Sequence, residues 1–117
     1  MDGIDLHTHS NISDGTLSPQ QLVQAALEKG LKVLALTDHD TIAGLDEAKM
    51  TAQGSGLKII DGCEISSQWS RPTTKKTYAV HIVALNMQRP EILQNMLKQQ
   101  QIVRAERAKK YVNYYKV

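Results

Sequence analysis

Two histidines, His7 and His9, follow a short apolar pattern in which Ile4 and Leu6 alternate with polar residues. Residues two apart in a β-strand point to the same face, so both imidazoles can be directed at one point in space. Asp14 follows within a polar turn a few residues later. Two imidazoles on one strand face with a carboxylate nearby form the beginning of a metal site with nitrogen and oxygen ligands.

The other histidines and several acids also lie in or at the ends of predicted strands, and no histidine falls in a predicted helix. The carboxyl ends of parallel strands meet at one side of an α/β fold, where ligand sites form. The side chains that can converge there are those of His7, His9, Asp14, His39, Glu64 and His81. This number of donors exceeds what one tetrahedral ion requires, so it indicates two or more ions of Zn²⁺, Mn²⁺ or Fe²⁺. Clustered ions of this kind serve hydrolysis, including displacement at phosphorus.

Alternating strand and helix patterns position these residues. Strands are predicted at 3–7, 31–37, 57–65 and 78–85, and helices at 19–29, 41–53 and 90–114. Ser18, Pro19 and Gln21 form a helix-start signal, and Gly30 is a typical helix stop. Strands that alternate with helices predict an α/β fold with mostly parallel strands, either as a barrel or as an open sheet.

The composition is typical of a single globular domain with its own hydrophobic core. The chain has 117 residues, a net charge of +2 and an apolar fraction of 41%. This charge is too small to indicate nucleic-acid binding by itself, and no apolar segment reaches the length of a membrane span. The single cysteine, Cys63, cannot form an internal disulfide and is expected to fill the core. A cytoplasmic location is the simplest expectation for such cysteine usage.

Four ordered segments resemble the PHP family of phosphoesterases (polymerase and histidinol phosphatase). They are DLHTHSNISDG at 5–15, LALTDHDTIAG at 34–44, IDGCEIS at 60–66 and VHIVAL at 80–85. Within the family, they are most similar to the branch that removes a 3′ phosphate from nucleoside 3′,5′-bisphosphates. That branch also includes enzymes that trim short RNA from the 5′ end. The resemblance implies a distorted βα barrel, of which this chain would form the N-terminal part.

The resemblance also implies the cofactors and the residue roles. It implies two or three divalent ions, Mn²⁺ first and Zn²⁺ or Fe²⁺ as alternatives, and a nucleotide or short-RNA substrate. The implied metal ligands are His7, His9, Asp14, His39, Glu64 and His81. The implied catalytic residues are His7, His9, Asp14, His39 and Asp40. Asp5 and Asp38 are implied as hydrogen-bond acceptors that orient imidazoles. Arg71 and Lys75 are candidates for contact with a substrate phosphate.

Members of this family are usually much longer and contribute further ligands late in the chain, whereas no histidine follows His81 here. We therefore expect residues 1–117 to form a single PHP-like domain that is incomplete at its C-terminus. This departure supports an alternative function, a non-catalytic module that binds metal or self-associates. Unpaired sheet edges would favour such a homo-oligomer.

Several of these residues also have a simpler interpretation. Asp14 lies in a Ser-Asp-Gly turn, where Asp is common for its bonding to the backbone. Asp40 can be the N-cap of the second helix. His81 can be a hydrogen-bonded core histidine. Arg71 and Lys75 can belong to a solvated, hairpin-like connection over 66–77.

Overall fold

The computed structural model describes the backbone of residues 3–115 and the side chains of residues 3–106, 108 and 109. The chain forms two compact units, one ending at Met87 and the other beginning at Gln88. The elements of the first unit are β1 (Gly3–Thr8), α1 (Pro19–Glu28), β2 (Leu31–Leu36), α2 (Leu45–Ala52), β3 (Lys58–Ser70) and β4 (Thr77–Leu85). The second unit consists of α3 (Pro90–Tyr115), as the sequence predicts for this segment.

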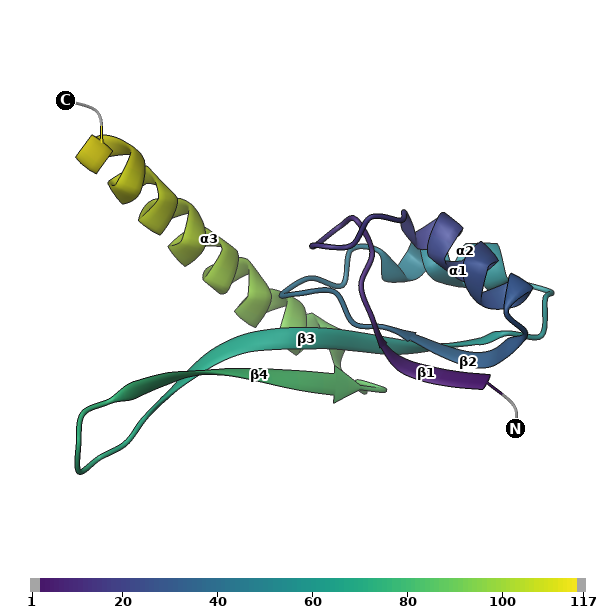
Figure 1. Ribbon diagram of the computed structural model, residues 1–117, viewed down its shortest axis with the longest axis horizontal. Helices are drawn as coiled ribbons and strands as arrows, with labels where there is room; N and C mark the ends of the chain where they lie inside the picture. Colours follow the sequence, from purple (N-terminus) through teal and green to yellow (C-terminus); the bar gives the residue numbers. More distant parts are fainter. Residues whose placement is uncertain (1–2, 116–117) are drawn as a thin grey trace. The chain divides into compact units, whose positions relative to one another are not determined.

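The sheet has the strand order β1-β2-β3-β4. β1 pairs with β2 and β2 pairs with β3 in parallel, whereas β4 runs antiparallel to β3. Helices α1 and α2 lie together on one side of the sheet (Figure 1) and pack against β2 and β3. The predicted α/β class with mostly parallel strands is confirmed, and the strands form a curled half-barrel whose edges are β1 and β4.

The predicted capping residues of α1 form the expected hydrogen bonds. The Ser18 hydroxyl accepts a hydrogen bond from the Gln21 amide, and the Gln21 side chain accepts one from the Ser18 amide. This reciprocal pair satisfies two of the amides that an α-helix leaves without partners in its first turn. Gly30 has a φ of 75° just after the helix, a conformation that glycine adopts without steric cost.

The core between the helices and the sheet is aliphatic. Its buried members are Val23, Ala26, Leu34, Leu36, Leu45, Ala48, Ala52 and Leu57. Burial of this apolar surface fixes the helices on the sheet and thereby fixes where the strands end. Over the described residues, no helix combines the length and hydrophobicity needed to cross a membrane.

Two predicted boundaries are wrong. The second helix begins at Leu45 rather than at 41, and its N-cap is Gly44. A helix from 41 would need Asp40 as its extended N-cap, whereas Asp40 has a φ of 53° and its amide is bonded to the Glu64 carbonyl. β3 continues to Ser70 instead of ending at 65, because β4 folds back along it. Only residues 71–76 remain as the connection, which is the tip of a hairpin.

Candidate metal centre

Main-chain hydrogen bonds bring the ends of β1, β2 and β3 together. The Thr37 amide donates to the Thr8 carbonyl at 2.8 Å. The Glu64 amide donates to the Asp38 carbonyl, and the Asp40 amide donates to the Glu64 carbonyl, each at 3.0 Å. These bonds extend the parallel pairing past the last regular residue of β2, as a bridge between His39 and Glu64. Side chains from three separate segments therefore meet at one edge.

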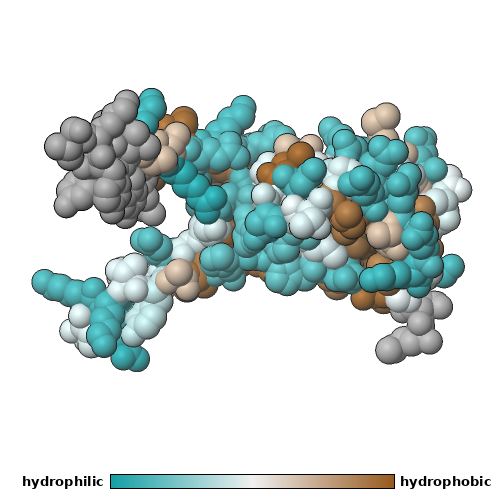
Figure 2. All heavy atoms as spheres, turned by 45° about the horizontal axis from the view of Figure 1, so that its top comes forward, coloured by the Kyte–Doolittle hydropathy of each residue, from teal (hydrophilic) through white to brown (hydrophobic). Residues whose placement is uncertain are grey.

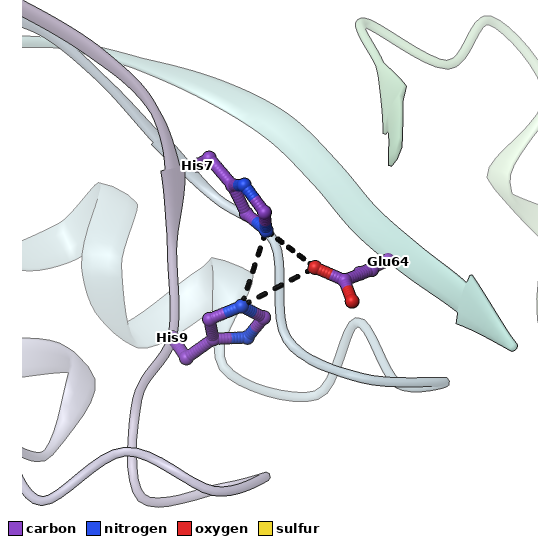
Figure 3. A group of neighbouring side chains, drawn as sticks. All are labelled: His7, His9 and Glu64. Atoms are coloured by element: carbon purple, nitrogen blue, oxygen red, sulfur yellow. Dashed lines mark hydrogen bonds and ion pairs between the residues drawn. The ribbon is translucent and has the colours of Figure 1, made fainter. Parts of the chain in front are cut away.

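Glu64 lies at the centre of this edge, with one carboxylate oxygen directed at each of two histidine pairs. Its Oε1 contacts Nε2 of His7 and lies 3.3 Å from Nε2 of His9. Figure 3 shows both rings directed from the β1 segment toward that oxygen on β3. Its Oε2 lies 2.8 Å from Nδ1 of His81 and 3.3 Å from Nδ1 of His39.

Asp14 completes the group from the loop that follows β1. Its Oδ2 lies 3.2 Å from Nε2 of His39, and its Oδ1 lies 3.6 Å from Nδ1 of His9. All six predicted ligand residues thus come together, and we call them the histidine–carboxylate cluster. Three triplets within it place one ligand atom from each residue within 4.8 Å of the others. The triplets are His7–His9–Glu64, His9–Asp14–His39 and His39–Glu64–His81.

The electrostatics of the histidine–carboxylate cluster fit a bound cation. Glu64 is buried, with 6% of its surface exposed, and the hydrogen bond from His81 holds its pKa down to about 2 against the opposing effect of burial. The Nε2 atoms of His7 and His9 lie 3.3 Å apart and face the same carboxylate oxygen. His9 Nδ1 is buried and has no hydrogen-bond partner among the described residues. Converging nitrogen and oxygen lone pairs around an ionised carboxylate are the chemistry of a divalent metal site.

The neighbouring acids contact main chain and hydroxyls rather than imidazole rings. Asp5 Oδ1 accepts a hydrogen bond from the backbone amide of His7, not from its ring. Asp38 is buried and accepts hydrogen bonds from the Ser10 amide at 2.6 Å and from the hydroxyls of Ser10 and Ser13 at 2.7 and 2.9 Å. These contacts fix the turn that carries His9 and Asp14, so they position ligands through the backbone.

Asp40 has a different role from the expected helix cap. Its Oδ1 accepts a hydrogen bond from the Ser66 amide at 2.7 Å, and it is buried. It therefore joins the loop after β2 to β3, two residues beyond Glu64. The alternative that Asp40 caps the second helix is wrong, because Gly44 occupies that position.

The structure also tests the simpler interpretations of His81, Cys63, Arg71 and Lys75. His81 is half exposed, so it is not a core histidine. Cys63 is fully buried, and burial raises the pKa of its thiol to about 11, which keeps it neutral and suits core filling. Arg71 and Lys75 are exposed at the tip of the β3–β4 hairpin, which agrees with a hairpin-like connection there.

Sequence reasoning did not single out Ser10, Ser13 or Gly62. In the sequence, the two serines have the character of turn residues. Only the fold shows that both hydroxyls donate hydrogen bonds to the buried carboxylate of Asp38. At Gly62, a Cβ atom would lie 2.6 Å from Cγ2 of Thr37 and 2.9 Å from the carbonyl oxygen of Leu36. The absence of a side chain there lets β3 approach the end of β2 closely enough to place Glu64.

Known proteins share this fold and these motifs. The PHP domain profile matches residues 5–116, so the resemblance inferred from the motifs is confirmed. A 5′-3′ exoribonuclease of Haemophilus influenzae is 45% identical over 105 residues, which cover 89% of this chain and 36% of that protein. A 3′,5′-nucleoside bisphosphate phosphatase of Chromobacterium violaceum is 42% identical over 87 residues, covering 74% and 28%.

Solved structures agree with these relatives. A Chromobacterium violaceum protein described as an amidohydrolase, with bound sulfate and no metal, superposes with a TM-score of 0.77 at 38% identity. That match covers 92% of this chain and 36% of the other. A Bifidobacterium adolescentis protein described as a metal-dependent phosphoesterase gives a TM-score of 0.75 at 33% identity, covering 97% and 38%. The chain thus spans about a third of the length of the curated relatives it matches.

Proposed function

The chain belongs to the PHP domain family, and we propose that its histidine–carboxylate cluster is the metal centre of a phosphoesterase that hydrolyses phosphomonoesters of nucleotides. The observation that carries this proposal is the placement of Glu64, whose two oxygens each face a pair of imidazoles. The name of the bisphosphate phosphatase supports hydrolysis of phosphomonoesters, and the name of the exoribonuclease supports hydrolysis of the phosphodiester bond at an RNA 5′ end. The family match across 5–116 supports one PHP-like domain over residues 1–117.

We infer at least two divalent ions from the ligand atoms available. The triplets His7–His9–Glu64 and His39–Glu64–His81 share only Glu64, and a carboxylate can give one oxygen to each of two ions. A third ion at Asp14 would have to share His9 and His39 with the other two, and a neutral imidazole offers only one lone pair. Mn²⁺ is the first expectation and Zn²⁺ or Fe²⁺ the alternatives, since all three accept nitrogen and oxygen ligands. Bound ions would act as Lewis acids on a phosphoryl group.

The chain's own residues account for binding and positioning. His7, His81 and Asp14 are exposed over about half or more of their side chains, so the histidine–carboxylate cluster opens to solvent on that side. A substrate phosphate can approach there, while the buried carboxylate of Glu64 lies beneath. Asp40 would contribute to catalysis by fixing the strand that carries Glu64 rather than by contact with substrate.

For the substrate, we propose a nucleoside 3′,5′-bisphosphate or the 5′ end of a short RNA, with Arg71 and Lys75 contacting a phosphate of the longer, RNA substrate. The two activities named for the relatives support these choices. Nucleotide substrates and the single cysteine, Cys63, support a cytoplasmic place of action.

The test is hydrolysis by the purified chain loaded in turn with Mn²⁺, Zn²⁺ or Fe²⁺. We expect phosphate release from 3′-phosphoadenosine 5′-phosphate, or release of nucleotides from a 5′-phosphorylated oligoribonucleotide, with at least one metal. His39→Ala should abolish the activity, and Lys32→Ala, at the opposite end of β2, should not. Absence of any metal-stimulated release from either substrate by a folded, metal-loaded chain would overturn the proposal.

A second candidate function is a non-catalytic module that binds metal or self-associates. β4 supports it, because it is an edge strand of the described sheet and exposes apolar side chains such as Val80, Ile82 and Leu85. Such an edge can pair with an edge of a second copy. A chain that binds metal or sediments as a dimer, and shows no turnover, would favour this candidate, whereas turnover of either substrate would exclude it.

A further inference from the structure

We propose that the β3–β4 hairpin is a binding arm for the phosphodiester backbone of a single-stranded oligonucleotide whose terminal phosphate lies at the histidine–carboxylate cluster. This inference rests on the proposed function and narrows its substrate class to chains of several nucleotides. It depends on three features of the hairpin: a polar face continuous with the cluster, a cationic tip and a length that no mononucleotide can span.

The polar face follows from the strand register. β3 and β4 pair without interruption from Gly62 opposite Leu85 to Ser70 opposite Thr77. Alternate residues of a strand share a face, and directly opposed residues lie on the same face. The residues that share the face of Glu64 and His81 and lie closer to the tip are Ser66, Gln68, Ser70, Thr77 and Ala79. This face therefore offers hydroxyl and amide groups and no carboxylate.

The opposite face of the hairpin carries a pair of aromatic side chains near the tip. Trp69 and Tyr78 are directly opposed, and their rings stack with centroids 5.9 Å apart. On the polar face, the hydroxyls of Ser70 and Thr77 lie 3.1 Å apart. These cross-strand pairs hold the end of the hairpin together, so the arm presents one defined polar surface.

The tip concentrates positive charge. Arg71, Lys75 and Lys76 are all exposed there, and a short turn holds them together, with the Arg71 amide bonded to the Lys76 carbonyl and the Lys75 amide to the Arg71 carbonyl. Figure 2 shows hydrophilic side chains gathered at this end of the hairpin. The chain has no acidic residue between Glu64 and Glu91, so no sequence neighbour neutralises the three cations.

The length of the arm makes this arrangement selective. From Glu64 to Ser70, the antiparallel strand rise of about 3.4 Å per residue gives roughly 20 Å. A stacked strand with one phosphate per 3.4 Å needs about six nucleotides to cover that distance. A mononucleotide phosphate bound at the cluster cannot reach Arg71 and Lys75, whereas a longer chain reaches both ends at once.

The expected energetic signature is a dependence on salt. The logarithm of the association constant falls linearly with the logarithm of the salt concentration, with a slope of about −0.7 for each phosphate of a single strand that a cation neutralises. Three cations therefore give a slope of about −2. Between 50 and 200 mM salt, this corresponds to about a 20-fold loss of affinity for an oligonucleotide that reaches the tip. A dinucleotide should lack this component.

The test is fluorescence anisotropy of oligoribonucleotides with a free 5′ phosphate and a 3′ label, two or eight nucleotides long, in EDTA so that binding is separated from hydrolysis. The test variant is Arg71→Gln/Lys75→Gln/Lys76→Gln. The control variant, Lys29→Gln/Lys32→Gln/Lys58→Gln, removes the same charge from the other end of the parallel strands. We expect tighter binding of the eight-mer to the wild type, a salt slope weakened by about two in the test variant, and no such change in the control.

Three results would overturn the proposal that the β3–β4 hairpin is a binding arm. They are equal binding of both lengths, equal effects of the two triple variants, and equal competition by inorganic polyphosphate of matched charge. Failure of the proposed function is distinguishable, because it would abolish release of phosphate and of nucleotides while leaving length-dependent binding in EDTA intact. Conversely, a chain that hydrolyses mononucleotides but shows no length dependence retains the function without the arm.

Discussion

Replacement of Glu64 by glutamine should dismantle the metal centre while leaving the fold in place. The buried carboxylate gives Oε1 to the His7 and His9 side and Oε2 to the His39 and His81 side. Glutamine has nearly the same shape but only one oxygen, and it carries no charge. At most one of the two triplets that share Glu64 can then keep three ligands.

The size of the effect can be worked out from linkage. At a free Mn²⁺ concentration 100 times the dissociation constant, binding stabilises the native chain by about 2.7 kcal/mol. Loss of a partner that merely orients a ligand costs 10–100-fold in affinity, so loss of a ligand should cost at least about 100-fold. At the same Mn²⁺ concentration, the stabilisation of Glu64→Gln then falls to about 0.4 kcal/mol. For a chain of this length, the metal-induced rise in Tm should shrink from about 10 °C to about 2 °C.

The assay combines elemental analysis of desalted protein with thermal denaturation at increasing Mn²⁺. The matched control is Glu28→Gln, which makes the same chemical change at an exposed position at the end of α1. We expect the control to behave as the wild type and Glu64→Gln to lose at least one ion per chain. If Glu64→Gln kept the wild-type metal content and the full rise in Tm, the bridging role of this carboxylate would be refuted.

The same structure makes four further predictions. Because His81 holds the pKa of Glu64 near 2 rather than 4.5, the unfolded state takes up the proton first. Urea denaturation should therefore show the metal-free chain losing stability as pH falls from about 4.5 toward 2, a component absent from Glu64→Gln. The raised pKa of the buried Cys63 thiol, about 11, has the opposite sign, so stability should fall as pH rises from 9 to 11, and a disulfide reagent should label the thiol only after unfolding. Gly62→Ala should cost about 1–3 kcal/mol in the free energy of unfolding, because its Cβ would overlap the end of β2. Asp38→Ala should cost about 3 kcal/mol by the same measurement, since three donors would lose their shared acceptor.

The sequence was most informative where local chemistry decides the structure. Ser18 and Gln21 cap α1 because their side chains reach only their own helix end, so no distant residue can change the outcome. The meeting of His7, His39 and Glu64 was predictable for a related reason. Parallel strands joined by short crossovers must end on the same side of the sheet, which the apolar patterns of the strands already indicate.

The sequence was less informative where distant partners decide the structure. β3 continues to Ser70 because β4 pairs with it, and this pairing depends on contacts across the hairpin rather than on the residues of β3 alone. α2 begins late because the Asp40 amide is bonded to the carbonyl of Glu64, far along the chain, and Asp40 has a positive φ. The carboxylate of Asp38 could not be assigned to Ser10 and Ser13 without the fold, since serines in a polar turn usually bond to the adjacent backbone.

The central claim is that one buried carboxylate lies between two metal ions. The most direct measurement is anomalous diffraction from crystals of the chain grown with Mn²⁺. We predict one anomalous peak between Glu64 Oε1 and the imidazoles of His7 and His9, and a second between Glu64 Oε2 and those of His39 and His81. Saturating Mn²⁺ with no peak at coordination distance from Glu64, or with peaks only elsewhere on the chain, would contradict the account.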